Sequence, residues 1–268
     1  MPYVQANGIQ LFYEERGTGD PLLLIMGITA PGSVWEKHVA SWEQQFRCIF
    51  FDNRGVGLSD KPAGPYTTAQ MGDDCAGLLE ALDIPIARVA GVSMGSTIAM
   101  QLALRHPDKV SAMVLMCPWA RCDRKGEAVF RHMMHAKRLR PEEFSNFIQQ
   151  LIYHKSSWDD DAVYQDLMQS QQAEASNPFP QPLHGLEGQA HACIQHQVLA
   201  ELPSIEQPCL VIGGKEDQFI PAWMAQEVAA AIPDSTLHLY DEAGHAFHWE
   251  KIEDFNPRVL KWLIEHGD

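Results

Sequence analysis

The strongest chemical signal in the sequence is a serine between two glycines at a predicted turn from a strand into a helix. The segment Gly91–Gly95 reads Gly-Val-Ser-Met-Gly, follows a short apolar run, and precedes a helix predicted over 94–105. This arrangement is typical of a nucleophile elbow, in which a strained turn exposes the serine hydroxyl. The helix start would direct free backbone N–H groups toward Ser93. We therefore expect Ser93 to be a nucleophile.

A serine attacks efficiently only when a base removes its proton and an acid orients that base. Asp217 follows a strand predicted over 208–213, and His245 follows a strand predicted over 235–240. Groups at the carboxyl ends of parallel strands gather at one edge of an open α/β sheet. We therefore expect Asp217 as the acid and His245 as the base, with Glu216 as the alternative acid.

Apolar runs that alternate with helical patterns indicate the fold class. Strands predicted over 22–26, 48–51, 88–92 and 110–116 alternate with helices, which favours a mainly parallel sheet with helices on both faces. After Pro118 the sequence becomes rich in charge, Gln, Met and His, and helices are predicted over 125–139, 141–153, 159–175 and 189–200. We expect an α/β core of residues 1–118 and 204–268 with a helical insertion over 119–203.

Composition limits the classes of partner. The chain has 268 residues, 46% of them hydrophobic, and a net charge of −15. An acidic body repels nucleic acid and anionic membranes, so a small molecule is the expected partner of a monomer or homodimer. Six scattered cysteines without a Cys-x-x-Cys pair, several in apolar runs, favour buried free thiols and a cytoplasmic location. The sequence shows neither a signal-peptide pattern nor a run of roughly 20 apolar residues.

Two patterns that could bind metal or phosphate are incomplete. His132 and His135 lie three residues apart, but no carboxylate or cysteine is spaced to complete a metal site. The loop 52–60 contains Gly-x-Gly but lacks the third glycine that opens a helix in a dinucleotide site. We therefore expect an exposed histidine face, a turn held by Asp52 and Arg54, and no metal or cofactor.

Together these motifs resemble the α/β-hydrolase superfamily over nearly the whole chain. The order Ser93, Asp217, His245 is the family's order, and residues 244–250 match its Gly-His-x-Phe-x-x-Glu pattern. The resemblance implies a mostly parallel eight-stranded sheet in which the helical insertion forms a lid. Serine at position 93 separates the chain from haloalkane dehalogenases and epoxide hydrolases, which resemble this fold but carry an aspartate nucleophile.

The resemblance also assigns the oxyanion hole, which needs two backbone donors. Met94 follows the nucleophile and is expected to supply one N–H group. The family usually has His-Gly where this chain has Met26-Gly27, a variant similar to that of anthracycline methyl esterases and enol-lactonases. The resemblance gives the second donor to the backbone N–H of Ile28.

The expected activity is hydrolysis of a carboxylic ester or lactone without a cofactor. Aromatic, Met and His side chains would line an apolar pocket for a bulky substrate, such as a polyketide ester or macrolactone, although packing of the insertion explains the same pattern. The residues expected at this substrate pocket are Trp119, Phe130, Met134, Phe147 and His248. Two alternatives remain: a ligand receptor with slow turnover on the same scaffold, and C–C bond hydrolysis or perhydrolysis by the same triad.

Overall fold

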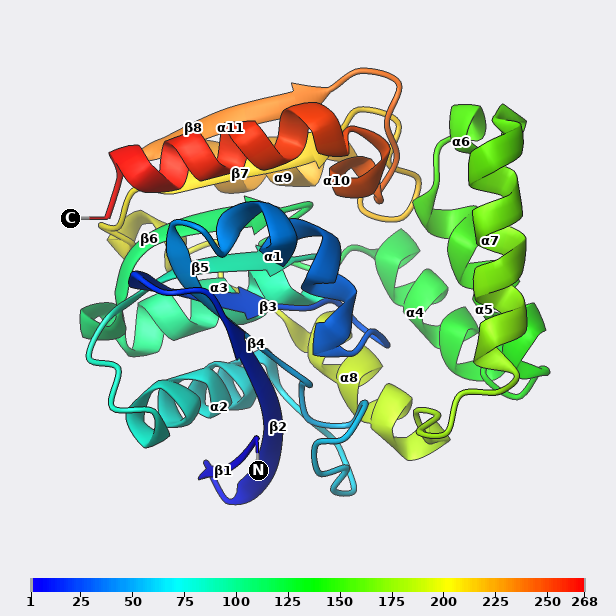
Figure 1. Ribbon diagram of the computed structural model, residues 1–268, viewed down its shortest axis with the longest axis horizontal. Helices are drawn as coiled ribbons and strands as arrows, with labels where there is room; N and C mark the ends of the chain where they lie inside the picture. Colours follow the sequence, from blue (N-terminus) through cyan, green and yellow to red (C-terminus); the bar gives the residue numbers. More distant parts are fainter. Residues whose placement is uncertain (1, 268) are drawn as a thin grey trace.

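One eight-stranded sheet forms the centre of the molecule (Figure 1). The computed structural model describes residues 2–267. The order across the sheet is β1-β2-β4-β3-β5-β6-β7-β8, antiparallel up to β4 and parallel from β4 to β8. The strands are β1 (Tyr3–Ala6), β2 (Ile9–Arg16), β3 (Asp20–Ile25), β4 (Phe46–Phe51), β5 (Ala87–Val92), β6 (Val110–Met116), β7 (Cys209–Gly214) and β8 (Ser235–Tyr240). The mostly parallel eight-stranded sheet is therefore confirmed.

The burial of the strands explains their sequence patterns. Every residue of β5 and β7 is buried, as are all but one of β6. A parallel strand covered by helices on both faces needs such a continuous apolar run. In contrast, β2 and β8 contain several exposed positions and carry more polar residues.

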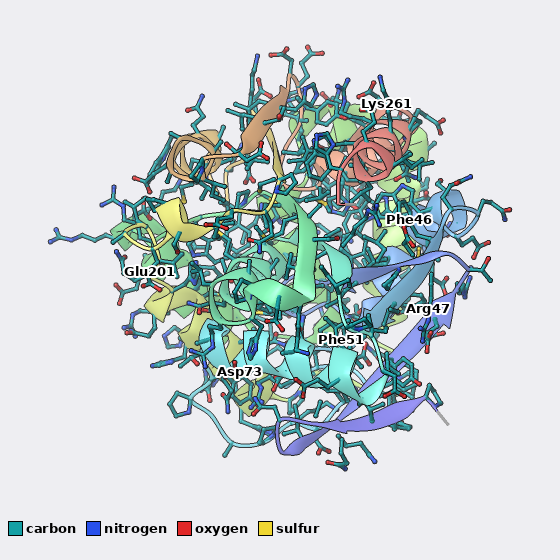
Figure 2. The ribbon with its side chains drawn as sticks, turned by 90° about the vertical axis from the view of Figure 1, so that its left-hand side faces the viewer. Phe46, Arg47, Phe51, Asp73, Glu201 and Lys261 are labelled. Carbon is teal, nitrogen blue, oxygen red and sulfur yellow. The ribbon has the colours of Figure 1, made fainter. Side chains whose placement is uncertain are left out.

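Helices cover both faces of this sheet. In Figure 2, α2, which carries Asp73, and α11, which carries Lys261, lie on opposite sides of the sheet. The core helices are α1 (Glu36–Trp42), α2 (Thr68–Ala81), α3 (Met94–Arg105), α9 (Ala222–Ala231), α10 (Phe247–Glu250) and α11 (Ile252–Glu265). Short 3-10 turns also form at η1 (Gly32–Trp35), η2 (Pro107–Lys109) and η3 (Leu202–Ser204). The predicted helix over 94–105 is confirmed at both ends, whereas the short helix α10 was not predicted.

The segment between β6 and β7 is helical, as expected. Its helices are α4 (Arg124–Ala136), α5 (Pro141–Ile152), α6 (Lys155–Asp159), α7 (Asp161–Glu174) and α8 (Leu183–Gln195). The single helix predicted over 159–175 is wrong at its start, because the Asp160 side chain accepts from the N–H groups of Ala162 and Val163 and begins a new helix there. The helix predicted over 189–200 is also displaced: α8 begins at Leu183, directly after Pro182. Figure 1 shows α4 to α7 beside the sheet edge toward which the parallel strands point.

The turn after β4 differs in part from its prediction. Asp52 holds it, because its two carboxylate oxygens accept from the N–H groups of Gly32 at 2.6 Å and Leu58 at 2.7 Å. Arg54 instead pairs with Asp74 on α2 at 2.5 Å, with both side chains buried. The arginine therefore joins the loop to a helix and leaves the aspartate to order the turn.

The six cysteines are free, and all but the half-buried Cys122 are buried. His132 and His135 are exposed on α4, as predicted. Within residues 2–267, no helix combines the length and apolar character needed to cross a membrane.

Candidate active site

Ser93 lies at the sharp turn between β5 and α3. Its backbone has φ 57° and ψ −121°, a conformation that is strained for a residue with a side chain. A Cβ on Gly95 would lie 2.0 Å from the carbonyl oxygen of Ile25, and a Cβ on Gly91 would lie 2.3 Å from that of Gly95. The turn therefore requires both glycines, because neither space can admit a methyl group.

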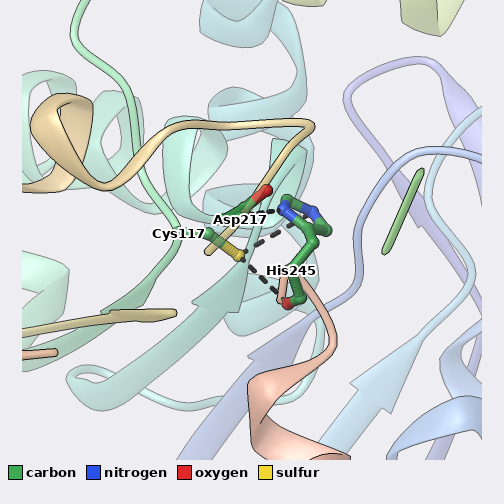
Figure 3. A group of neighbouring side chains, drawn as sticks. All are labelled: Cys117, Asp217 and His245. Atoms are coloured by element: carbon green, nitrogen blue, oxygen red, sulfur yellow. Dashed lines mark hydrogen bonds and ion pairs between the residues drawn. The ribbon is translucent and has the colours of Figure 1, made fainter. Parts of the chain in front are cut away.

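Asp217 and His245 are joined by a hydrogen bond although 28 residues separate them. The Nδ1 atom of His245 lies 2.7 Å from Oδ2 of Asp217, and both side chains are buried (Figure 3). The other carboxylate oxygen accepts from the N–H groups of Phe219 and Ile220, each at 2.8 Å. Asp217 is thereby fixed by its own loop and holds the imidazole with its remaining oxygen. Glu216 accepts instead from the N–H of Ala243.

Ser93 and His245 line the same cavity. The buried Oγ of Ser93 has no hydrogen-bond partner within residues 2–267. The Nε2 atom of His245 lies 3.8 Å from Sγ of Cys117, which directly follows β6 (Figure 3). The chain thus brings a candidate nucleophile, base and acid into one place, with the serine hydroxyl available for a new contact.

Charge at the site favours the imidazolium form of His245. Burial alone would lower the pKa of His245, but the Asp217 carboxylate bonded to Nδ1 outweighs burial and raises it. Burial raises the pKa of the Cys117 thiol, which keeps that group protonated. Asp217 therefore stabilises the positive charge that His245 would acquire on accepting a proton.

Cys117, Asp217 and His245 are the one group of side chains within residues 2–267 whose ligand atoms are close enough to hold a metal ion. Their atoms lie within 4.8 Å of one another. Asp217, however, uses one oxygen for two N–H groups and the other for His245. A metal ligated by this carboxylate would have to replace those bonds, so the geometry fits a hydrogen-bonded relay better.

Two residues that sequence analysis did not assign hold the loops of the site. Gln189 on α8 is fully buried, and its Oε1 accepts from the N–H of Thr29 at 3.0 Å in the loop after β3. Glu250 accepts from the N–H of Gly244 at 2.7 Å and from that of His154 at 2.6 Å. The glutamine had no sequence signal, whereas the glutamate belongs to the Gly-His-x-Phe-x-x-Glu pattern and could have been assigned this role.

The cavity is small and mainly apolar. Its volume is about 90 Å³, well below the roughly 300–1,000 Å³ of sites for drug-sized ligands. Its wall includes the apolar side chains of Met26, Ile28, Val92, Met133, Ile148, Ile152, Phe219 and Trp249.

The predicted substrate-pocket residues are only partly at this cavity. His248 lines it. Trp119 and Phe130 are instead buried against each other, with ring centroids 5.9 Å apart. Met134 does not line the cavity, and Phe147 lines a separate surface hollow with His132. Trp119 and Phe130 belong to the buried core. Met134 and Phe147 lie away from the cavity because their neighbours on α4 and α5, Met133 and Ile148, take the inward positions.

Comparisons with known proteins agree with this architecture. The family model described as the alpha/beta hydrolase fold matches residues 20–252. A Mycobacterium tuberculosis protein provisionally named non-heme bromoperoxidase BpoC is 34% identical, with 95% of this chain and 98% of that protein covered. A thermophilic esterase from Thermogutta terrifontis is 25% identical with a TM-score of 0.86, covering 99% of both chains. The structure of the enol-lactonase from Burkholderia xenovorans LB400 is also 25% identical, with a TM-score of 0.88. The match covers 98% of this chain and 100% of that chain. The chain therefore belongs to the α/β-hydrolase family.

Proposed function

We propose that this protein is a serine hydrolase that cleaves a carboxylic ester or lactone through Ser93, His245 and Asp217. The observation that carries the proposal is the 2.7 Å bond between His245 and Asp217 beside a strained serine in the same cavity. Structures of an esterase and an enol-lactonase, each 25% identical to this chain, support the ester and lactone class.

The reaction has two halves, and in each half His245 accepts one proton and then returns it. Ser93 Oγ attacks the carbonyl carbon while Nε2 of His245 accepts the hydroxyl proton, and Asp217 stabilises the imidazolium. Collapse of the tetrahedral intermediate breaks the ester bond, and His245 returns the proton to the leaving alcohol. Water then attacks the acyl-enzyme while His245 accepts a proton from it. The second tetrahedral intermediate collapses, the carboxylic acid leaves, and His245 returns the proton to Oγ of Ser93. The hydrogen bond between Ser93 and Nε2 forms in the substrate complex, since catalytic hydrogen bonds often tighten only there.

The backbone N–H groups of Ile28 and Met94 are the proposed oxyanion hole. Ile28 lines the cavity with Ser93, and Met94 is the first residue of α3, where the N–H groups have no partner inside the helix. Donors fixed in this way stabilise the negative charge of the tetrahedral intermediate. Gln189 supports the first donor by holding Thr29, the next residue of the loop.

The cavity favours a short, uncharged acyl group over the bulky substrate expected from the sequence. Its lining residues include no Lys, Arg, Asp or Glu, so apart from His245 the cavity offers no side chain that could pair with a charged substrate. A macrolactone would extend well beyond this cavity of about 90 Å³ and would contact the helical insertion, α4 to α8, of which α4 and α5 line the cavity. We propose that these helices act as the lid of the site, over a core formed by residues 1–118 and 204–268.

The test is hydrolysis of p-nitrophenyl acetate, butyrate and octanoate by the wild type and by Ser93→Ala. We expect the butyrate ester to be cleaved and the variant to lose on the order of 10⁴-fold or more in kcat/KM. A fluorophosphonate probe should label the wild type but not the variant. Unchanged hydrolysis by Ser93→Ala would exclude the mechanism.

Perhydrolysis is a second candidate because one relative, 34% identical, is named as a bromoperoxidase. In this reaction hydrogen peroxide replaces water as the attacking group on the acyl-enzyme, and a peracid leaves in place of the acid. The same Ser93 variant would abolish both activities, so product analysis separates them. Peracid formation from acetate and peroxide, measured through bromide oxidation, would favour this candidate.

A further inference from the structure

A line of buried polar side chains runs from the cavity to the surface. His248 on α10 borders the cavity, and its Nδ1 lies 2.9 Å from Nε2 of His38 on α1. The Nδ1 of His38 lies 2.6 Å from Oδ1 of Asn256 on α11. The amide Nδ2 of Asn256 donates to Oγ of the exposed Ser41 at 3.0 Å. The exposed fractions of His38, His248 and Asn256 are 0, 3 and 6%.

Both imidazoles in this line are uncharged near neutral pH. Burial, only partly offset by the bond to Asn256, lowers the pKa of His38 to about 4. Burial also lowers the pKa of His248 well below 6.5, and the nearby His38 and His245 lower it further. A neutral imidazole has one N–H donor and one bare nitrogen that accepts. The nitrogen that carries the proton on one ring therefore determines which nitrogen carries it on the next.

Asn256 determines which nitrogen of each imidazole in this line donates and which accepts. Because Asn256 presents Oδ1, an acceptor, His38 must carry its proton on Nδ1. Its Nε2 is then bare and accepts from Nδ1–H of His248. His248 consequently has a bare Nε2. The two nitrogens of an imidazole point in nearly opposite directions, so Nε2 lies on the far side of the ring from the bond to His38, and His248 is one of the residues that line the cavity.

We propose that His248 is a specificity-determining residue whose bare Nε2 selects esters or lactones that carry a hydroxyl or N–H donor near the scissile carbonyl. The proposal rests on the proposed function and adds the substrate class to it. An acceptor in an apolar cavity is costly to leave unpaired once a substrate has displaced water. A substrate with a donor satisfies it, whereas an analogue without the donor leaves it unpaired.

Besides His248 and the candidate triad residues, two polar side chains line the cavity, and one of them provides a control. Thr29 has a hydroxyl, which could also accept from a substrate, whereas the indole of Trp249 can only donate. Thr29→Val is close in size and removes only the competing acceptor. His38 does not line the cavity, so His38→Leu changes the tautomer of His248 without touching the substrate.

The experiment compares p-nitrophenyl 3-hydroxybutyrate with p-nitrophenyl 3-fluorobutyrate, which is similar in size and polarity but has no donor. We expect the wild type to favour the hydroxy ester by about tenfold or more in kcat/KM, mainly through KM. His248→Phe should reduce this ratio to about one, and His38→Leu should lower it. Thr29→Val should keep it.

A ratio near one in the wild type would overturn the proposal without any variant, and so would an unchanged ratio in a folded His248→Phe. If only Thr29→Val lost the preference, the acceptor would be the threonine and not the histidine. Hydrolysis of the fluoro ester, and its loss in Ser93→Ala, reports on the proposed function separately. A specificity result therefore cannot be mistaken for a failure of the triad.

Discussion

Replacing Asp217 by asparagine separates the proposed effect of its negative charge on His245 from its role in holding the backbone of its own loop. One carboxylate oxygen accepts two backbone N–H groups and the other faces Nδ1 of His245. In Asp217→Asn the new amide oxygen would stay with the two N–H donors, because the alternative orientation would set the amide NH₂ group against both. That NH₂ group would then face Nδ1, and His245 would have to carry its proton on Nε2. In that tautomer Nε2 cannot accept the proton of Ser93.

The expected loss follows from this geometry. Misorienting the base of a serine triad in the same way lowers kcat about 10⁴-fold, which corresponds to about 5 kcal/mol of transition-state stabilisation. The two backbone N–H bonds survive in Asp217→Asn, so stability should fall by only about 1 kcal/mol. Asp217→Ala leaves both buried donors unpaired, at about 1–3 kcal/mol each, and should lower Tm by at least about 2 °C more.

The assay combines steady-state hydrolysis of p-nitrophenyl butyrate with thermal unfolding of both variants. We expect equal losses of kcat but clearly different Tm values. A kcat of more than a tenth of wild type in folded Asp217→Asn would refute the role of Asp217 as the acid. Equal Tm values for the two variants would refute the structural role of the N–H bonds.

Three further outcomes follow from the same contacts. The proposed mechanism needs His245 in its neutral form, and its pKa is raised above 6.5. The value of kcat/KM should therefore fall as the pH drops through a value above 6.5. An acidic limb of the pH profile with its midpoint at or below 6.5 would contradict this. Gly95→Ala would put a Cβ 2.0 Å from the carbonyl oxygen of Ile25, and should cost more than about 3 kcal/mol in urea unfolding. Gly213→Ala is the control, since its nearest neighbour at 3.3 Å is a flexible side chain. Glu250→Ala removes the acceptor of the Gly244 N–H beside the candidate base and should lower kcat/KM at least about tenfold. Glu250→Gln keeps an acceptor and should lower kcat/KM less. Equal kcat/KM values for the two variants would show that the acceptor is not needed.

The sequence predicted the sheet and the approach of the three candidate residues because both depend on local patterns. Continuous apolar runs identify buried parallel strands, and the residues that follow them lie at one edge by topology alone. Ser93, Asp217 and His245 are such residues. Their bond lengths, and the approach of Cys117 to the base, depend on packing that no spacing reveals.

The cavity wall could not be predicted in the same way. On α4 and α5 several apolar residues compete for inward positions, and Met133 and Ile148 occupy them where Met134 and Phe147 were expected. The rotation of a helix about its axis is set by the tertiary contacts of its whole apolar face. No local pattern in the sequence could indicate the contact between His38 and His248, because 210 residues separate them.

Hydrogen bonds join the end of α5 to the loop 243–246, which carries the candidate base His245, and this limits how the site can open. The carbonyl oxygen of Ile152, at the end of α5, accepts from the N–H of Ala246 at 2.8 Å, directly after the candidate base. Ile152 also lines the cavity, and Glu250 holds both His154 and Gly244. The end of α5 therefore cannot move away from this loop without breaking these hydrogen bonds. Any opening that keeps the base in place must come from the parts of the insertion that these bonds do not hold.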